Sequence, residues 1–525
     1  MRSTLACALF FLIPAKSAAA SPPAAPPAAQ PVRPAPESYR SGFDAISEAD
    51  LRAWLGFLAA DELEGRESGT KGYDVAARYV ASVLESLGVA PLGDGGTYFQ
   101  AFDLVRRERN LEEGFLSIRT ASGVEERASL AGQMAVRAVP GEIPAAIDWE
   151  QPWVCAGRGE SAAEDAVDDF HGLDVAQSVV LVLPRPGRTE SEDRGARLAG
   201  AQRIVVVSDK KVADGAGIRF RERAEACPDG SSEPTAAATG PSTVYVSRKL
   251  ADQVLKARGS SLAEIESSER PQPFRLDGVQ LHLKIPVRET RRTTRNVAGI
   301  LQGSDPVLRG ECVAVGSHLD HVGTQNGTVF PGADDDASGV SAVLGVAKAF
   351  AKNPTRPRRS LVFLFFAAEE KGLFGSQWYV DHPPVALASM ALELQMDMVG
   401  RNEERGAPGE PNAETPADNE DTLHVVGSKR HSLELDPWVT SINDFVGLRF
   451  EYDEERVYSR SDQYNFGSRG VPVVFFFSGF HPDYHQPTDT PKKINFRKLG
   501  LVTRLVFALG FEVADRPARL RIHRV

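Results

Sequence analysis

Six consecutive apolar residues, Leu361-Val-Phe-Leu-Phe-Phe366, are separated by only two alanines from the acidic pair Glu369-Glu370. An uninterrupted apolar run of this length is typical of a strand that is buried on both faces, whereas a half-exposed strand alternates apolar and polar residues. We therefore predict that 361–366 is a central strand of a sheet that is covered by helices on both sides.

The flanking sequence repeats an order of strand, loop and helix. Helical periodicity predicts helices at 338–350 and 496–510. Four further apolar runs are predicted to be strands: Val313–Val315, Leu392–Met398, Leu423–Val426 and Val471–Phe477. Strands that alternate with helices predict an α/β fold with a mostly parallel mixed sheet flanked by helices.

The chain of 525 residues is longer than one hydrophobic core usually serves, so we expect two folded units. We predict that a first segment at 41–115 and a main segment at 291–515 form one unit. Between them, 116–290 reads as a small β-rich inserted domain, because short β-like runs alternate there with polar turns. These runs are 178–183, 203–207 and 242–246.

The N-terminus has the features of a signal peptide. A basic residue, Arg2, precedes the apolar run Leu5–Pro14, and small residues follow at Ser17–Ala20. The run is too short to span a bilayer, and no other run is long enough. We predict a signal peptide at 1–20, a Pro/Ala-rich linker at 21–40, and export to the periplasm or the medium.

Charge and cysteine content exclude some classes of protein. The formal net charge of -11 argues against nucleic acid as a partner. Behind the predicted signal, Cys155, Cys227 and Cys312 allow at most one internal disulfide and form no CxxC pair. A disulfide framework and a cysteine zinc site are therefore not expected, and Cys312 is predicted to be a buried thiol.

Acidic and histidine residues follow the predicted strands or open the helix at 338. They are His318, the triplet Asp334-Asp335-Asp336, Glu369-Glu370, Asp397 and His485. Each alone has an ordinary explanation, such as a helix N-cap for the triplet or a solvated surface for the Glu pair. Because sites in open α/β sheets form at the carboxyl ends of strands, we expect these residues to gather on one rim.

This set of side chains suits metal ions. Two histidines and three carboxylates are donors that zinc accepts, and manganese or cobalt could also use them. If five side chains serve two ions, one carboxylate must bridge them. Each ion then has three protein contacts and an open position, as catalysis requires.

The order and spacing of these residues resemble the M28 family of zinc aminopeptidases. The resemblance is carried by Gly316-Ser-His-Leu-Asp320, Pro331-Gly-Ala-Asp-Asp-Asp-Ala-Ser-Gly339, Ala368-Glu-Glu370, Met396-Asp-Met398 and Tyr484-His485, with Leu63-Glu-Gly-Arg66 similar to the family's first segment. The insertion loosely resembles a protease-associated domain. The resemblance implies a metallopeptidase that holds two Zn²⁺ ions and acts on peptides or proteins.

The resemblance also assigns metal ligands. His318 and Asp397 would bind one zinc ion, Glu370 and His485 the other, and Asp335 would bridge them.

One assignment has alternatives, and three further roles follow from the resemblance. Asp334 and Asp336 compete with Asp335 for the bridging role. Asp320 would orient the His318 ring, Glu369 would be the general base for attack by a metal-bound hydroxide, and Tyr484 would stabilise the oxyanion.

The sequence departs from the family at Ser461-Asp462-Gln463, where many members have Ser-Asp-His. His321 and His481 match no required position, and we interpret both as rim residues that are structural or face solvent. An aminopeptidase is the expected activity. A zinc carboxypeptidase remains the main alternative, with a glutaminyl cyclase and a non-catalytic binding protein on the same fold as less favoured ones.

Overall fold

The computed structural model describes residues 33–137, 146–161, 168–183, 194–213, 220–225, 242–268, 271–406 and 415–522. The predicted signal peptide, the linker up to residue 32, and Cys227 lie outside these residues. No helix in the described ranges is long and apolar enough to cross a membrane.

The centre of the larger lobe is a mixed sheet whose middle strands are parallel, as predicted. β18 (Ser360–Phe366) pairs in parallel with β15 (Cys312–His318), β15 with β19 (Met390–Met396), and β19 with β22 (Val473–Phe477). Of the other pairs in this sheet, β20 (Thr422–Val426) and β21 (Arg449–Glu451) are parallel and the rest are antiparallel. The full order is β10 (Phe220–Glu225), β2 (Phe99–Arg109), β14 (Val287–Leu301), β18, β15, β19, β22, β20 and β21, with β1 (Ala90–Pro91) beside β14.

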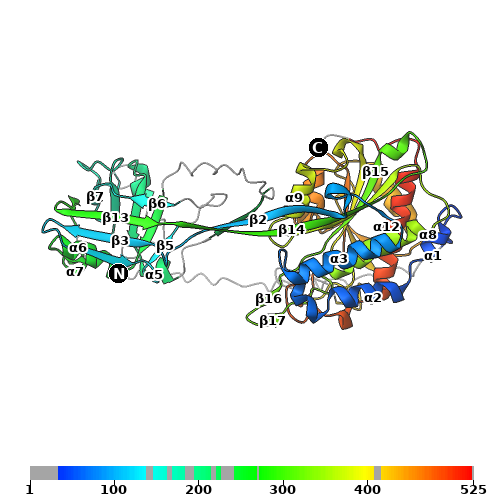
Figure 1. Ribbon diagram of the computed structural model, residues 1–525, viewed down its shortest axis with the longest axis horizontal. Coiled ribbons are helices and arrows are strands. Elements are labelled where there is room, and N and C mark those ends of the chain that lie inside the picture. Colours follow the sequence, from blue (N-terminus) through cyan, green and yellow to red (C-terminus); the bar gives the residue numbers. More distant parts are fainter. Residues whose placement is uncertain are drawn as a thin grey trace, which may run out of the picture.

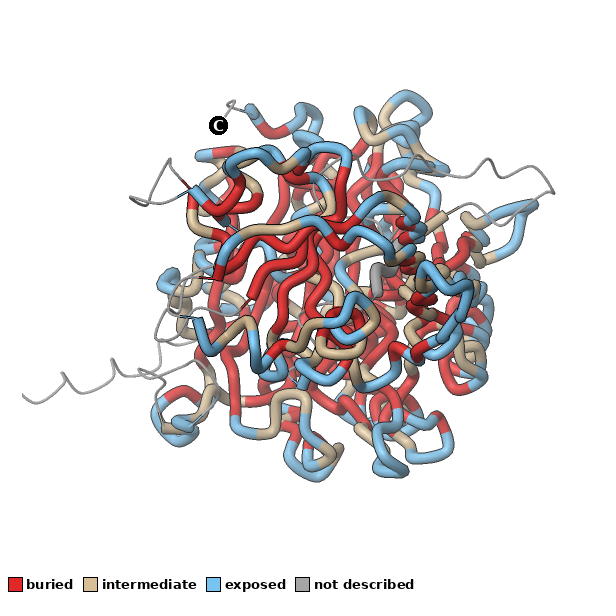
Figure 2. The backbone as a smooth tube through the Cα atoms, turned by 90° about the vertical axis from the view of Figure 1, so that its left-hand side faces the viewer, coloured by how far each residue is buried: buried red, intermediate tan, exposed pale blue. Residues whose placement is uncertain are grey.

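Both faces of the β18 strand are buried, which explains its unbroken apolar sequence. Phe363 and Phe365 belong to the core on one face, together with residues of the helices that cover it. Leu364 and Phe366 alternate to the opposite face and belong to a second cluster that contains Tyr379. Successive side chains of a strand point to opposite faces, so each face needs its own cover. Figure 2 shows these strands as a buried block beneath exposed loops.

Helices supply that cover on both sides. On one face α8 (Ala337–Lys352) and α12 (Phe496–Asp515) pack against the central strands, with α1 (Arg40–Asp44), α2 (Glu48–Leu58) and α3 (Lys71–Ser86) beside them. On the other face lie α9 (Phe374–Asp381) and α11 (Gln463–Gly467). Cys312 is buried, as predicted, and neither it nor Cys155 forms a disulfide within the described ranges.

Two long strands lead away from this lobe. β2 and β14 pair antiparallel along their length and run as a ribbon into a second lobe (Figure 1). The second lobe contains a six-stranded sheet in the order β12 (Phe274–Arg275), β7 (Trp153–Cys155), β8 (Val179–Val182), β9 (Arg203–Val207), β11 (Ser242–Val246), β5 (Met134–Val136), and a four-stranded sheet in the order β4 (Glu125–Ser129), β3 (Phe115–Thr120), β13 (Val279–Ile285), β6 (Ile147–Trp149). The lobe has its own apolar cores.

The first helix of the larger lobe's initial segment is shorter than its sequence predicts. The sequence predicts one helix over Ser47–Leu63, but α2 ends at Leu58 and a 3₁₀ segment, η1 (Asp61–Arg66), follows. Within η1, Gly65 has a φ of +70°, and a Cβ there would lie 2.4 Å from the carbonyl oxygen of Gly323. The chain therefore bends because it packs closely against the loop that follows β15.

Candidate metal centre

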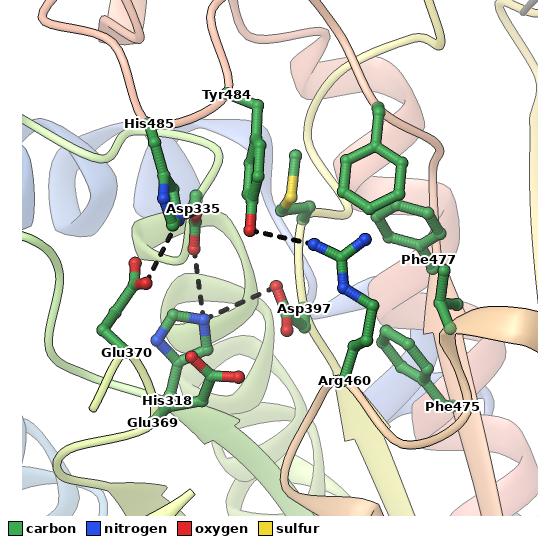
Figure 3. A pocket seen from close by; sticks show the side chains of 13 residues that line it. His318, Asp335, Glu369, Glu370, Asp397, Arg460, Phe475, Phe477, Tyr484 and His485 are labelled. Carbon is green, nitrogen blue, oxygen red and sulfur yellow. Dashed lines mark hydrogen bonds and ion pairs between the residues drawn. The ribbon is translucent and has the colours of Figure 1, made fainter. Parts of the chain in front are cut away.

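The predicted site residues gather at the carboxyl ends of the parallel strands. His318 is the last residue of β15, and Asp397 directly follows β19. The loop after β18 brings Glu370, and the loop after β22 brings His485. These four residues, with Asp335, Glu369 and Tyr484, line one open hollow of about 340 Å³ (Figure 3).

Two groups of metal donors share Asp335. In the first group, His318 Nε2 lies 3.2 Å from Asp335 Oδ1 and 3.5 Å from Asp397 Oδ1. In the second group, His485 Nε2 lies 3.0 Å from Asp335 Oδ2 and 3.1 Å from Glu370 Oε2. Because its two oxygens face different groups, Asp335 is placed as a bridging carboxylate would be.

The neighbouring aspartates are occupied elsewhere. Asp336 caps α8 by accepting from Gly339 N at 2.9 Å, and it also accepts from Met398 N at 3.1 Å. Asp334 accepts from Gly400 N at 2.7 Å. Both carboxylates are therefore bound to main-chain amides, and of the triplet only Asp335 belongs to the two donor groups.

Asp320 contacts His318 through a different atom than expected. Its main-chain oxygen lies 3.1 Å from His318 Nδ1, whereas its carboxylate Oδ1 is 4.0 Å from that nitrogen. The carbonyl therefore accepts the Nδ1 proton and leaves Nε2 as the donor toward a metal. The Asp320 carboxylate instead accepts from Glu369 N at 3.1 Å. Burial raises the pKa of Asp320 to about 6.

Glu369 lines the hollow but belongs to neither donor group. Burial raises its pKa well above the ordinary value; His318 opposes the rise, while Glu370 and Asp397 add to it. For Asp335, burial would raise the pKa, but the neighbouring histidines hold it well below the ordinary range. The carboxylates of Glu369 and Asp335 thus differ in proton affinity. The higher affinity of Glu369 suits a group that carries a proton, and the lower affinity of Asp335 suits a metal ligand.

Tyr484 lies beside the donor groups. Its ring stacks on that of His485 at 3.9 Å, and its hydroxyl accepts a hydrogen bond of 3.3 Å from Arg460 Nη2. Burial raises the pKa of Tyr484, and the carboxylates of Asp335 and Glu370 raise it further. The hydroxyl therefore keeps its proton and can donate it in a hydrogen bond.

The far wall of the hollow is apolar apart from one cation. It consists of Met398, Val457, Phe475, Phe477 and Phe480. The Arg460 guanidinium lies 4.8 Å from the centre of the Phe480 ring. Arg460 is the only lysine or arginine among the described residues that line the hollow.

The sequence predicts that His321 and His481 are rim residues, either structural or solvent-facing. Both are buried, which excludes the solvent-facing alternative. His481 Nε2 contacts Asp334 at 3.2 Å and is structural. His321 instead joins the second donor group, with Nδ1 at 2.8 Å from Glu370 Oε1. Its place directly after Asp320 was a signal, but the spacing does not reveal which way the loop turns.

The departure from the family pattern at Gln463 has a structural explanation. Ser461, Asp462 and Gln463 are all buried, and Gln463 Nε2 donates to Tyr458 O at 2.8 Å. The amide therefore holds its own loop beneath the site. Burial raises the pKa of Asp462 to about 7.

The donor atoms fit zinc. Imidazole nitrogens and carboxylate oxygens are its usual ligands in proteins outside cysteine sites. His485 Nε2 is buried and has no hydrogen-bond partner among the residues that the structure describes, although two carboxylate oxygens lie within 3.1 Å. A nitrogen so placed has its lone pair free for an ion between those oxygens. Three neighbouring carboxylates in the two groups also need positive charge nearby.

The fold is an α/β sheet covered by helices, and two groups of residues that could hold metal ions lie at the carboxyl ends of its parallel strands. Residues 296–510 match Peptidase family M28, and this segment belongs to that family. The matched segment begins in β14 and ends in α12, so it contains all the donor residues.

Individual relatives match parts of the chain. A "probable leucine aminopeptidase 2" from Aspergillus oryzae is 36% identical over 122 residues, 23% of each chain. "Aminopeptidase YwaD" from Bacillus subtilis is 27% identical over 234 residues, 43% of this chain and 46% of the relative. The chain thus spans half or less of these curated relatives. A solved "Aminopeptidase from Aneurinibacillus sp. strain AM-1" is 20% identical, with a TM-score of 0.47 over 92% of this chain and 98% of that one.

Proposed function

We propose that this protein is an exported aminopeptidase that uses two zinc ions to hydrolyse the peptide bond next to a free N-terminus. The observation that carries the proposal is Asp335, whose two carboxylate oxygens face separate donor groups. The names of the relatives, which are aminopeptidases, support the choice of reaction. Export rests on the N-terminal sequence alone.

The metal ions, when bound, would supply Lewis acidity at the scissile carbonyl and make a water molecule more acidic. His318, Asp397, Glu370 and His485 would hold them, with Asp335 shared. Manganese or cobalt could replace zinc at these donors.

The proton transfers belong to Glu369. Its carboxylate takes a proton from the attacking water and delivers it to the leaving amine. A raised pKa suits this role, because the group must hold the proton between the two transfers. The Asp320 carboxylate accepts the Glu369 amide hydrogen and so fixes the main chain of the base.

Tyr484 would stabilise the oxyanion that forms from the carbonyl oxygen. Because Arg460 donates to the tyrosine oxygen, the hydroxyl proton is free to point toward the substrate.

The test of this mechanism is Glu369→Gln. The variant should keep its metal and its fold but lose turnover by about 10²–10⁴-fold, the usual contribution of a general base. Glu85→Gln, on the exposed surface of α3, is the matched control and should behave as wild type. Full activity in Glu369→Gln would refute the mechanism, and absence of metal from the purified wild type would favour a binding protein.

One observation favours a carboxypeptidase as the second candidate. Arg460, a cation on an otherwise apolar wall, could bind the terminal carboxylate of a peptide. A panel of free and N-acetylated peptides separates the two activities. Cleavage of acetylated peptides from the C-terminal end, with a raised KM in Arg460→Met, would replace the aminopeptidase proposal. Cleavage that requires a free N-terminus would support it.

A further inference from the structure

His321 is held in a fixed position beside the second donor group. Its side chain is fully buried. Its main-chain N–H donates to Arg66 O at 3.3 Å. On the opposite side, a Cβ at Gly332 would come within 2.6 Å of the imidazole ring, so Gly332 leaves room for that ring. This packing gives His321 one orientation rather than the freedom of a surface side chain.

The polar contacts of the His321 ring go to the donor group. Nδ1 lies 2.8 Å from Glu370 Oε1 and 3.8 Å from Asp335 Oδ2. Nε2 is buried and has no hydrogen-bond partner within the described part of the chain. The ring meets that of His485 edge to face, at 5.5 Å between centres.

We propose that His321 is a fourth protein ligand at the metal position formed by Asp335, Glu370 and His485, bound through Nδ1. The inference rests on the proposed function only in that this position binds a metal. One donor atom from each of the four residues lies within 4.8 Å of the others, a span that one ion can fill.

The two metal positions then differ in their number of protein ligands. The group of His318, Asp335 and Asp397 offers three protein donors, the number found at catalytic zinc sites that keep a place for water. The other group offers four, the number found at closed sites that hold zinc tightly. The ion beside His321 is therefore the tightly held one, and the ion beside His318 exchanges more readily.

The competing explanation is that Nδ1–H only donates to Glu370 and orients this carboxylate. Loss of such a partner also weakens metal binding, so affinity alone does not separate the two roles. The distance from His321 Nδ1 to zinc separates the two roles, because a ligand nitrogen lies about 2.0–2.1 Å from zinc and a nitrogen that is hydrogen-bonded to Glu370 lies farther away.

The decisive experiment is a crystal structure of the zinc-loaded full chain with anomalous data at the zinc edge. Two zinc peaks with His321 Nδ1 at ligand distance from one of them support the inference. Two peaks with Nδ1 hydrogen-bonded to Glu370 and about 3 Å or more from zinc overturn it and leave the proposed function intact. No bound zinc would overturn both.

A variant provides a readout in solution. Wild type should release zinc to a chelator in two separate steps. In His321→Gln the affinity for the tightly held zinc ion should fall at least about tenfold, so that its release comes closer to that of the other ion. His282→Gln is the control, because it removes an imidazole that lies 2.6 Å from a carboxylate, that of Asp148, in the other lobe. A tight step that is unchanged in His321→Gln would contradict the inference.

Discussion

Arg66 ties together the segments that carry the metal donors. Its guanidinium is buried and donates to four main-chain oxygens, those of Leu58, Leu319, Pro331 and Gly332, at 2.5–3.0 Å. Leu319 directly follows His318, and Gly332 lies three residues before Asp335. Replacement of Arg66 by Met should therefore damage both the stability of the fold and the geometry of the site.

The expected loss of stability follows from the hydrogen bonds to the four carbonyls. A hydrogen bond from a charged donor contributes about 1.5–3 kcal/mol net, and burial of the cation offsets part of the sum. We expect Arg66→Met to lower the free energy of unfolding by about 3–5 kcal/mol, because four main-chain carbonyls lose their donor while the cost of burying the cation disappears. Arg66→Lys keeps the charge but lacks the planar guanidinium group, so its free energy of unfolding should lie between those of wild type and Arg66→Met.

The assay is urea unfolding, followed by zinc content and kcat per folded molecule. Arg359→Met is the matched control, because Arg359 is equally buried and bonds Glu311 and the main chain of Arg516 away from the site. Both variants should lose stability, but only Arg66→Met should also lose zinc and kcat. Equal kcat per folded molecule in the two variants, or an unchanged unfolding midpoint in Arg66→Met, would refute this role.

Three further outcomes are expected. Asp320→Ala should keep its metal content, because the Asp320 carbonyl that meets His318 remains, but it should lower kcat by about tenfold, because the Glu369 amide loses its side-chain acceptor. Zinc analysis and steady-state kinetics check this, and an unchanged kcat would contradict it. Burial alone would raise the pKa of Asp483, but hydrogen bonds from Lys493, Thr488 and Arg401 lower it to about 2. Its carboxylate thus stabilises the fold above the unfolded-state pKa near 4 and loses this effect as the pH falls toward 2. Asp483→Asn should therefore unfold about 1 kcal/mol more easily at pH 7, a modest value for a partly exposed group, and match wild type near pH 2 in denaturation curves. Chelation of metal should lower the melting temperature reversibly, because the carboxylates of the site lose their counter-charge, and a curve insensitive to added zinc would count against a metal centre.

The sequence by itself determined the central sheet and the positions of most donor residues. An apolar run such as Leu361–Phe366 is typical of a strand buried on both faces, and parallel strands bring their carboxyl ends to one edge. His318, Asp397 and His485 follow such strands, so their convergence did not depend on knowing any side-chain contact.

The tertiary structure decided the contacts within that edge. Three adjacent aspartates are equivalent in sequence, and only packing directs Asp334 and Asp336 to main-chain amides and leaves Asp335 between the donor groups. The same holds for Asp320, whose carbonyl rather than carboxylate meets His318. His321 belongs to the site because its loop folds back beneath Arg66 and Gly332. Periodicity fixes which strand end a residue follows, but loop packing fixes where its side chain points.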